Sequence, residues 1–361
     1  MKLRKLHIDN YKMFKNFDIS FVDKKMRPLP IIILAGINSS GKTTILEFIN
    51  NFINLSTELD FIDIENDSQI KRFSKMKVSS NNMDYLNFKK LKKLNIEDYT
   101  KIVKQELIDN IVYIPMDIGN IKRVEMEFVK SFYFLLKEKD YRPSEVRENF
   151  DKYMMSFFGD LDLTFKYSHL DRDDNVWFEN KVGDKFKIEE LSTGEKTLIS
   201  KFLYLFFLDY KNKVILIDEP ELSLHPSWQN NALKIYENFA KKNDCQIIIA
   251  THSPHIIGSA ENKSLRFLIR DKSGNMSVVS NIKAYGRDIE WVLEQMGVEE
   301  MRLPKIAKKL DEIQELINNQ EFNKAESELD KLEYLIGEND KDILALRNDL
   351  AFERIDFEKD S

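Results

Sequence analysis

A glycine-rich loop followed by a lysine and two threonines stands out early in this chain of 361 residues. It runs from Gly36 to Thr44 with the spacing Gly-x-x-x-x-Gly-Lys-Thr-Thr. Glycines let a backbone fold closely around phosphate oxygens, and the amides at a helix start favour anions. At this spacing Lys42 would reach the β- and γ-phosphates of a nucleotide, and the Thr43 hydroxyl would bind Mg²⁺. The predicted phosphate-binding residues are Gly36, Asn38, Ser39, Ser40, Gly41, Lys42, Thr43 and Thr44.

The sequence on both sides of the loop has the pattern that a phosphate site needs. The apolar run Ile31–Ala35 precedes the loop, and apolar residues at helical spacing follow it from Ile45 to Ile49. Strand, loop and helix in this order form a phosphate-binding unit. A glycine turn that precedes a lysine by chance is the alternative, and the two flanks argue against it.

Two adjacent carboxylates, Asp218 and Glu219, follow the apolar run from Val214 to Ile217. The run predicts a buried strand, so both carboxylates would lie at its carboxyl end. There Asp218 suits Mg²⁺ binding and Glu219 suits the activation of an attacking water. An acidic turn after a core strand would be the simpler interpretation of the pair alone, but the loop upstream favours the catalytic one.

A third strand is predicted over Gln246–Thr251, and His252 follows it directly. In open α/β sheets, ligands bind at the carboxyl ends of the strands. His252 could be a core histidine with internal partners, but its place at a strand end favours a contact with the γ-phosphate.

Ser192 and Glu195 have the spacing of a capping box, at the start of an apolar helix predicted over residues 198–210. Capping explains the serine and the glutamate. It does not explain why the cap lies shortly upstream of the strand that carries Asp218 and Glu219.

The remaining sequence predicts the elements that position these residues. Alternating apolar residues predict a hairpin over residues 1–22 with its turn at Lys15–Asn16, strands over 161–188, and a hairpin over 265–279. Residues 121–158 predict two helices broken near Pro143. From Leu303 onward the spacing predicts an αα-hairpin and a third helix, which resembles a single tetratricopeptide-like unit. A lone unit buries its apolar face poorly, so we expect it to pack on the rest of the chain, a second copy or a partner.

The composition limits the possible functions. No apolar run approaches the ~18 residues that a membrane helix needs, so we expect a cytoplasmic protein that has no membrane contact. Cys245 is the only cysteine, and the five histidines show no zinc-binding pattern. The net charge of −6 argues weakly against a dedicated nucleic-acid binder, and most of the excess acid lies in the tail.

Taken together and in this order, the motifs resemble the ATP-binding head of the ABC-type superfamily, in the branch of the RecF, SMC and OLD-like proteins. The resemblance identifies residues 36–44 as Walker A, 191–195 as the signature sequence, and 214–219 as Walker B. It identifies residues 221–225 as the D-loop region and His252 as the switch histidine. The resemblance implies an α/β P-loop NTPase fold of the ABC-ATPase head type. Such a fold has a mixed sheet with an antiparallel amino-terminal hairpin, and helices on both faces.

The resemblance also implies a mechanism. Two heads would face each other, so that Ser192, Gly194 and Glu195 of one head cap the ATP held by the Walker A loop of the other. Water would attack the γ-phosphorus in line, while Lys42 and Mg²⁺ offset the developing charge. Glu219 would orient or deprotonate the water, and His252 would sense the γ-phosphate. The glutamine of the Q-loop is not placed, because Gln69 and Gln105 are both candidates.

Three segments, 218–226 (Asp-Glu-Pro-Glu-Leu-Ser-Leu-His-Pro), 250–254 (Ala-Thr-His-Ser-Pro) and 285–288 (Tyr-Gly-Arg-Asp), are similar to the compact ATPases of bacterial defence operons. Among these, the chain most resembles the ATPase subunit of the Septu system, which is also found in certain retrons. This implies an ATPase that controls a separate HNH-type nuclease during phage infection. Residues beyond His255 show no Asp-x-Asp pattern for two-metal chemistry, so the nuclease would be another chain. We expect the head over residues 1–282, with a helical or variable insertion at about 50–160, and a helical region over 283–361.

Three other interpretations stay open. A RecF- or SMC-like DNA clamp would need a basic channel, for which Lys2–Lys15 and Lys89–Lys93 are the candidates. A transporter subunit is disfavoured, because no coupling loop is recognisable. ATP could also be structural, with slow or incidental hydrolysis.

Overall fold

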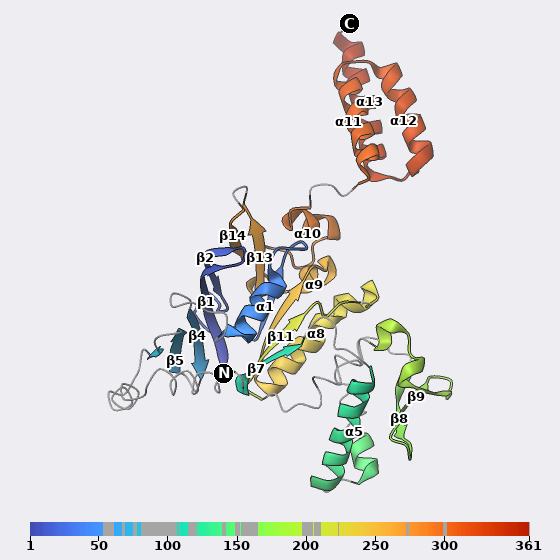
Figure 1. Ribbon diagram of the computed structural model, residues 1–361. Helices are drawn as coiled ribbons and strands as arrows, with labels where there is room; N and C mark the ends of the chain where they lie inside the picture. The colour runs from blue at the N-terminus through green and yellow to red at the C-terminus, as the bar shows by residue number, and fades with distance from the viewer. Residues whose placement is uncertain are drawn as a thin grey trace. The chain divides into compact units, whose positions relative to one another are not determined.

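The computed structural model divides the chain into two compact units, Met1–Gly297 and Val298–Ser361 (Figure 1). The structure describes residues 1–52, 61–66, 69–74, 78–80, 107, 109–114, 121–138, 142–148, 152, 165–196, 205, 211–222, 224–271, 274–298 and 302–360. The predicted helix over 198–210 therefore lies almost wholly outside the described residues.

A six-stranded sheet with the order β14-β13-β3-β12-β11-β7 forms the centre of the first unit. Its strands are β3 (Ile31–Ala35), β7 (Ile111–Ile114), β11 (Val214–Asp218), β12 (Gln246–Thr251), β13 (Leu265–Arg270) and β14 (Met276–Ser280). All neighbours pair in parallel except the edge strand β14, which is antiparallel to β13. Every residue of β3, β11 and β12 is buried, which explains why these strands are continuous apolar runs in the sequence.

An antiparallel sheet with the order β2-β1-β4-β5-β6 begins with the predicted amino-terminal hairpin. Its strands are β1 (Lys2–Tyr11), β2 (Phe14–Ser20), β4 (Phe61–Asn66), β5 (Gln69–Ser74) and β6 (Val78–Ser80). The turn lies at Lys12–Met13, so its prediction at Lys15–Asn16 was wrong, because Tyr11 already pairs with Phe14 and Asn10 with Lys15. Strands β4, β5 and β6 lie within residues 50–160, where the sequence predicted a helical or variable insertion, and they extend this sheet.

Two helices, α1 (Lys42–Asn50) and α8 (Pro226–Asn243), pack on the central sheet. Helix α1 contacts β11, β12 and β7, and α8 contacts β12 and β3. The short helices α9 (Pro254–Ser259) and α10 (Ile289–Gln295) contact each other, and residues 283–297 belong to the first unit. The other elements of this unit are α5 (Ile121–Glu138), the sheet β10-β9-β8 (Lys185–Lys187, Val176–Asn180 and Phe165–Leu170), and the 3₁₀ turns η2 (Ile188–Glu190) and η3 (Asn262–Ser264).

One apolar core joins the two large sheets. It contains Leu3, Leu6 and Ile8 of β1, four residues of α1, and residues such as Leu34 and Leu216 of the central strands. Two buried polar side chains cross the same boundary. The Gln246 amide of β12 donates to the carbonyls of Leu3 and Leu29 and accepts from the Leu3 N–H at 2.6 Å. Arg266 of β13 donates to the carbonyl of Ser20, the last residue of β2, and to that of Val22, two residues further on.

The second unit is a three-helix structure of α11 (Pro304–Asn318), α12 (Phe322–Ile336) and α13 (Lys341–Asp360). The helices bury the residues that the sequence spacing predicted, including Ile313, Ile317, Leu329, Ile343 and Leu350. Gly337 ends α12 with a φ of 101°, a conformation that glycine adopts easily. The third helix thus covers the apolar face of the first two, and the unit has its own core.

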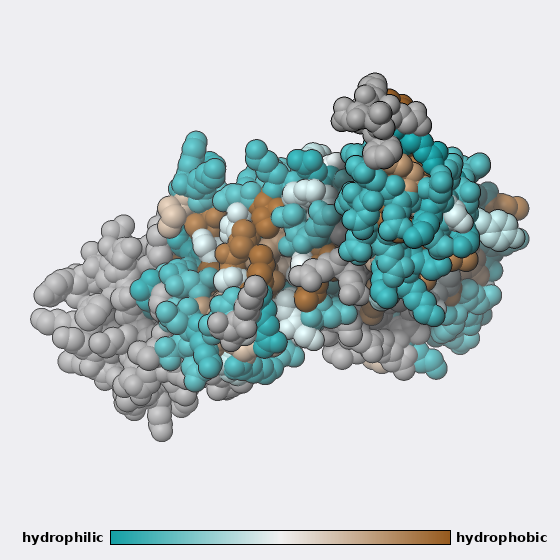
Figure 2. Space-filling model, turned by 90° about the horizontal axis from the view of Figure 1, so that it is seen from above, coloured by the Kyte–Doolittle hydropathy of each residue, from teal (hydrophilic) through white to brown (hydrophobic). Residues whose placement is uncertain are grey.

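Figure 2 shows the hydropathy of one face of the molecule. Among the coloured residues of this face hydrophilic ones prevail, and apolar residues gather in smaller patches. Among the helices that the structure describes, none is both long and apolar enough to cross a membrane.

Replacing Gln246 by alanine tests the link between the sheets. The change leaves the Leu3 N–H and two carbonyls buried without this partner, so we expect unfolding to become easier by about 2–4 kcal/mol. Urea denaturation measures the loss. The control is Gln314→Ala, a partly buried glutamine of α11 that bonds Asn318 on the same helix, for which we expect no change beyond about 0.5 kcal/mol. Equal stability of the two variants would contradict the structural role of Gln246.

Candidate functional site

The loop between β3 and α1 is shaped as a close-fitting cradle. Gly41 has a φ of 86°, and a Cβ there would lie 2.6 Å from Cζ of Phe14. A Cβ on Gly36 would lie 2.6 Å from the Ser40 hydroxyl and 3.0 Å from a backbone carbonyl. Both positions therefore need glycine. Ser40 Oγ is buried and has no hydrogen-bond partner among the described residues, as expected of a group that meets a ligand.

Lys42 lies inside this cradle. Its ammonium is buried and donates to the carbonyls of Gly36 and Ile37, each at 3.0 Å. Burial lowers the pKa of Lys42, and the nearby carboxylates of Glu219 and Asp218 act in the opposite direction. Backbone N–H groups and a buried cation at a helix start suit a polyphosphate.

The two predicted Mg²⁺ ligands are neighbours in space. The Thr43 hydroxyl donates to Oδ1 of Asp218 at 3.0 Å, although the residues are 175 positions apart. Burial is the main cause that raises the pKa of Asp218, and Glu219 adds to it, while the Thr43 hydrogen bond opposes both. A hydroxyl and a carboxylate beside a phosphate cradle fit a Mg²⁺ ion, which takes oxygen ligands.

Tyr113 is a neighbour of Asp218 that sequence reasoning missed. It lies on β7, and its hydroxyl is 3.5 Å from the second carboxylate oxygen of Asp218. Burial and the negative charge of Asp218 raise the pKa of Tyr113, so the hydroxyl keeps its proton. The Q-loop candidates remain unassigned, because Gln69 begins β5 of the other sheet and Gln105 lies outside the described residues.

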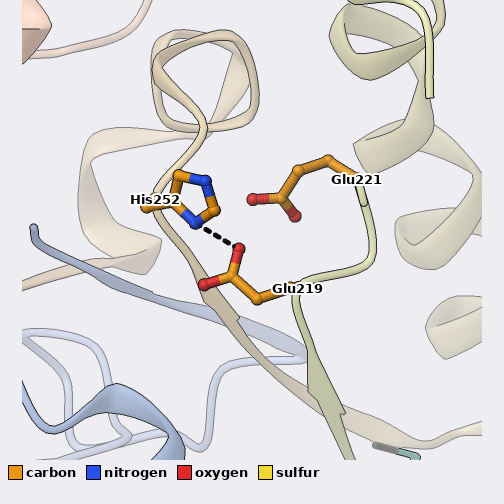
Figure 3. A group of neighbouring side chains, drawn as sticks. All are labelled: Glu219, Glu221 and His252. Atoms are coloured by element: carbon orange, nitrogen blue, oxygen red, sulfur yellow. Dashed lines mark ion pairs between the residues drawn. The ribbon is translucent and has the colours of Figure 1, made fainter. Parts of the chain in front are cut away.

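Glu219 and His252 meet at the tips of β11 and β12 (Figure 3). His252 Nδ1 is 2.5 Å from Oε2 of Glu219. Glu219 has a φ of 44°, and its N–H donates to the carbonyl of Ala250 at 2.9 Å. A non-glycine residue in this conformation costs free energy and is often found at functional sites. The Glu219 side chain is 10% exposed and that of His252 is 46% exposed, so the imidazole faces solvent.

Glu221 is a further member of the site. The sequence placed it in the D-loop region but predicted no role for its side chain. Its carboxyl is buried and points toward Glu219 and His252 (Figure 3). Burial, followed by the neighbouring Glu219, raises the pKa of Glu221 well above its usual range. Ligand atoms of Glu219, Glu221 and His252 all lie within 4.8 Å of one another, and this group could hold a cation or a shared proton.

The predicted signature residues form a local cap. Ser192 N–H donates to the Glu195 carboxylate at 2.9 Å, and Glu195 N–H donates to Ser192 Oγ at 3.3 Å. This reciprocal pattern confirms the capping box. Ser192 is exposed, Gly194 and Glu195 are partly buried, and the hydrogen bonds described here join the cap residues to each other and not to the cradle.

Comparison with known proteins agrees with this geometry. A family model described as "AAA ATPase domain" matches residues 1–158. A second model, for an AAA domain of a Type IV TA system, matches residues 124–258. Both models describe AAA domains, and each matches less than half of the chain.

The relatives of this chain include the Septu protein PtuA of Bacillus thuringiensis, 28% identical over 56% of this chain and 55% of that protein. The retron Ec83 probable ATPase of Escherichia coli is 30% identical over 50% of this chain and 35% of that protein. The chain thus spans about half the length of the first relative and a third of the second.

Among solved structures, an SMC head bound to the C-winged helix domain of ScpA aligns with a TM-score of 0.51. It covers 78% of this chain and 98% of that one at 17% identity, a likeness that shows the fold alone. The chain has the ABC-type head fold, as the sequence motifs predicted.

Replacing Glu219 by glutamine tests the role of this carboxylate in hydrolysis. The amide keeps the shape but cannot accept a proton from water, so we expect kcat to fall by about 10²-fold or more with ATP affinity nearly unchanged. Steady-state ATPase rates and nucleotide binding measure the two effects. The control is Glu261→Gln, an exposed carboxylate paired with Lys263 outside the site. A Glu219→Gln variant as active as this control would exclude Glu219 as the base.

Proposed function

We propose that this ATPase is the regulatory subunit of a bacterial anti-phage defence complex. It forms ATP-sandwiched homodimers or higher homo-oligomers and controls a separate HNH-type nuclease. The observation that carries the proposal is the set of side chains gathered at the carboxyl ends of the central parallel strands. This set occurs in a chain related to Septu and retron ATPases. ATP and Mg²⁺ are the cofactors.

Each residue of the site has one task in this proposal. Lys42 would exchange its bonds to the loop carbonyls for bonds to the β- and γ-phosphates, and Thr43 with Asp218 would hold Mg²⁺. Held there, Mg²⁺ would supply positive charge beside the phosphate oxygens. Glu219 accepts the proton of the attacking water, and His252 donates to the γ-phosphate from the solvent-facing side.

Two exposed segments, the phosphate loop and the predicted signature sequence, support a dimer. Residues 37–39 of the loop are exposed, and so is Ser192 at the start of its capped helix. A helix start presents unpaired N–H groups to an anion. Ser192 and Gly194 of one copy would then contact the γ-phosphate bound by the other copy, and Glu195 would keep the cap in shape.

The carboxylates of this chain support a nuclease on a separate chain. Among the described residues, one group of histidine and carboxylate ligand atoms is close enough to hold a metal ion, and it belongs to the ATPase site. Two-metal nuclease chemistry needs its own carboxylate cluster. In this proposal the effector activity belongs to a partner.

The DNA-clamp alternative finds less support in the structure. Basic residues of the amino-terminal hairpin face carboxylates: Lys2 pairs with Asp244, Arg4 with Glu65, Lys5 with Asp18 and Lys12 with Glu47. These pairs reduce the positive charge that DNA phosphates would meet. Lys89–Lys93 lies outside the described residues, and direct DNA binding stays a secondary proposal.

Replacing Ser192 by arginine tests the dimer. ATP should convert the Glu219→Gln protein, which cannot hydrolyse it, from monomer to dimer, because bound nucleotide joins the two heads. Adding Ser192→Arg should abolish this shift, since the larger side chain blocks the facing nucleotide. Light scattering after size exclusion reports the mass. Ser327→Arg, an exposed serine of α12, is the control and should dimerise normally. Dimers that persist with Ser192→Arg would contradict the sandwich.

Co-expression with the nuclease encoded by a neighbouring gene tests whether the two proteins form a complex. It also distinguishes a regulatory role of ATP hydrolysis from a purely structural role of bound ATP. We expect the two proteins to co-purify and nuclease activity to change when hydrolysis is blocked by Glu219→Gln. If ATP only holds the complex together, Glu219→Gln will be silent and Lys42→Ala will disrupt the assembly. A clean monomer that binds no neighbouring protein would contradict the proposal. Salt-dependent DNA affinity of the isolated ATPase would instead favour the clamp.

A further inference from the structure

Glu221 is a buried carboxyl that the proposed hydrolysis steps do not use. It lies two residues after Glu219 and is 4% exposed. Burial of a carboxyl is costly unless hydrogen bonds compensate for the lost water. The position of those hydrogen bonds indicates what Glu221 does.

The hydrogen bonds of Glu221 hold the chain on both sides of His252. One carboxyl oxygen, Oε1, accepts from the Thr251 hydroxyl and from the Ser253 N–H at 3.2 Å. The Ser253 N–H also donates to the Thr251 hydroxyl at 2.9 Å. His252 is the residue between these two donors. Its backbone is therefore fixed by a side chain that belongs to the turn after β11.

The same turn carries Glu219, whose backbone has a positive φ. Only Pro220 separates Glu219 from Glu221, so anchoring Glu221 to the end of β12 also restrains the backbone of Glu219. The second oxygen of Glu221 is buried beside the Glu219 and His252 side chains (Figure 3). The contact between Glu219 and His252 at 2.5 Å thus depends on two backbones that one carboxyl ties together.

We propose that Glu221 is a positioning residue of the ATPase: by binding Thr251 and Ser253 it holds His252 against Glu219. The inference rests on the roles proposed above for Glu219 and His252 and adds a residue that acts through them. Glu221 need not touch ATP, because its effect passes through the backbone of residues 251–253.

Further hydrogen bonds lead from this anchor to two helices. The Ser253 hydroxyl donates to Oε1 of Gln229 on α8 at 2.7 Å and accepts from the Ile256 N–H, which caps α9. The Gln229 amide in turn donates to the carbonyl of Leu224 at 2.9 Å. Glu221 therefore fixes the γ-phosphate side of the site to α8 and α9 as well as to β12.

The test compares two substitutions of Glu221. Glu221→Gln keeps an oxygen that accepts from Thr251 and Ser253, so we expect it to retain at least about a third of the wild-type kcat. Glu221→Leu fills a similar volume without an acceptor, and we expect its kcat to fall about 10-fold to 100-fold with ATP affinity unchanged. The control is Glu237→Leu, a half-buried carboxyl of α8 outside the site, which should keep full activity.

A double-mutant cycle with His252→Ala shows whether Glu221 acts through the histidine. His252→Ala by itself should lower kcat, and adding Glu221→Leu to this variant should lower kcat little further. Additive losses would overturn the positioning role, and so would a Glu221→Gln variant as impaired as Glu221→Leu, because charge, a shared proton or a bound cation would then matter. If His252→Ala leaves kcat unchanged, the proposed role of His252 itself fails, which distinguishes the two failures.

A second substitution covers the case in which Glu221→Leu does not fold. Thr251→Val removes one donor to Glu221 and leaves the carboxyl in place. We expect its kcat to fall by about threefold to tenfold, again with no further loss in the His252→Ala background. A Thr251→Val variant that loses ATP affinity in place of kcat would overturn the inference.

Discussion

The parallel register of three buried strands is the constraint on which the site depends. In the central sheet Ala35 of β3 pairs with Thr251 of β12, and Asp218 of β11 pairs with Ala250. The phosphate loop, the paired carboxylates and His252 each begin where one of these strands ends. A slip of one residue would move a strand tip by about 3.3 Å, more than the length of the hydrogen bond between Thr43 and Asp218. Packing on both faces of the sheet, and not contacts within the site, therefore sets the distances between the reacting groups.

The site by itself opposes folding. It gathers the Lys42 ammonium and three carboxyls, Asp218, Glu219 and Glu221, in a buried space, and it holds Glu219 at a positive φ. Burial raises the pKa of Asp218 and of Glu221, so it disfavours the charged forms of both carboxyls. The apolar core between the sheets, with Gln246 and Arg266 crossing it, offsets this cost. Phe14 of the amino-terminal hairpin belongs to that core and also lies against Gly41, so the hairpin supports the loop directly.

The sequence predicts the parts of this arrangement that are local in the chain. A phosphate loop, a capping box and three apolar runs that end in polar residues can each be recognised within about fifteen residues. Tyr113 and the anchoring role of Glu221 could not be recognised in this way. Tyr113 reaches Asp218 because β7 pairs with β11 across about a hundred residues, and Glu221 meets Thr251 because β11 pairs with β12. The prediction of the hairpin turn failed for a related reason. The residues Lys15 and Asn16 locally favour a turn, but the pairing between β1 and β2 places the turn at Lys12–Met13.

These long-range contacts explain how a chemical event at one strand tip can reach the surface of the head. Loss of the γ-phosphate would change what His252 binds, and His252 lies between two residues that Glu221 holds. Ser253 continues the chain of hydrogen bonds to Gln229 of α8 and to the first turn of α9. Helix α9 contacts α10, the last element of the first unit. The residues proposed to bind nucleotide are thus joined to α8, α9 and α10 by hydrogen bonds and packing, with Glu221 at the first step.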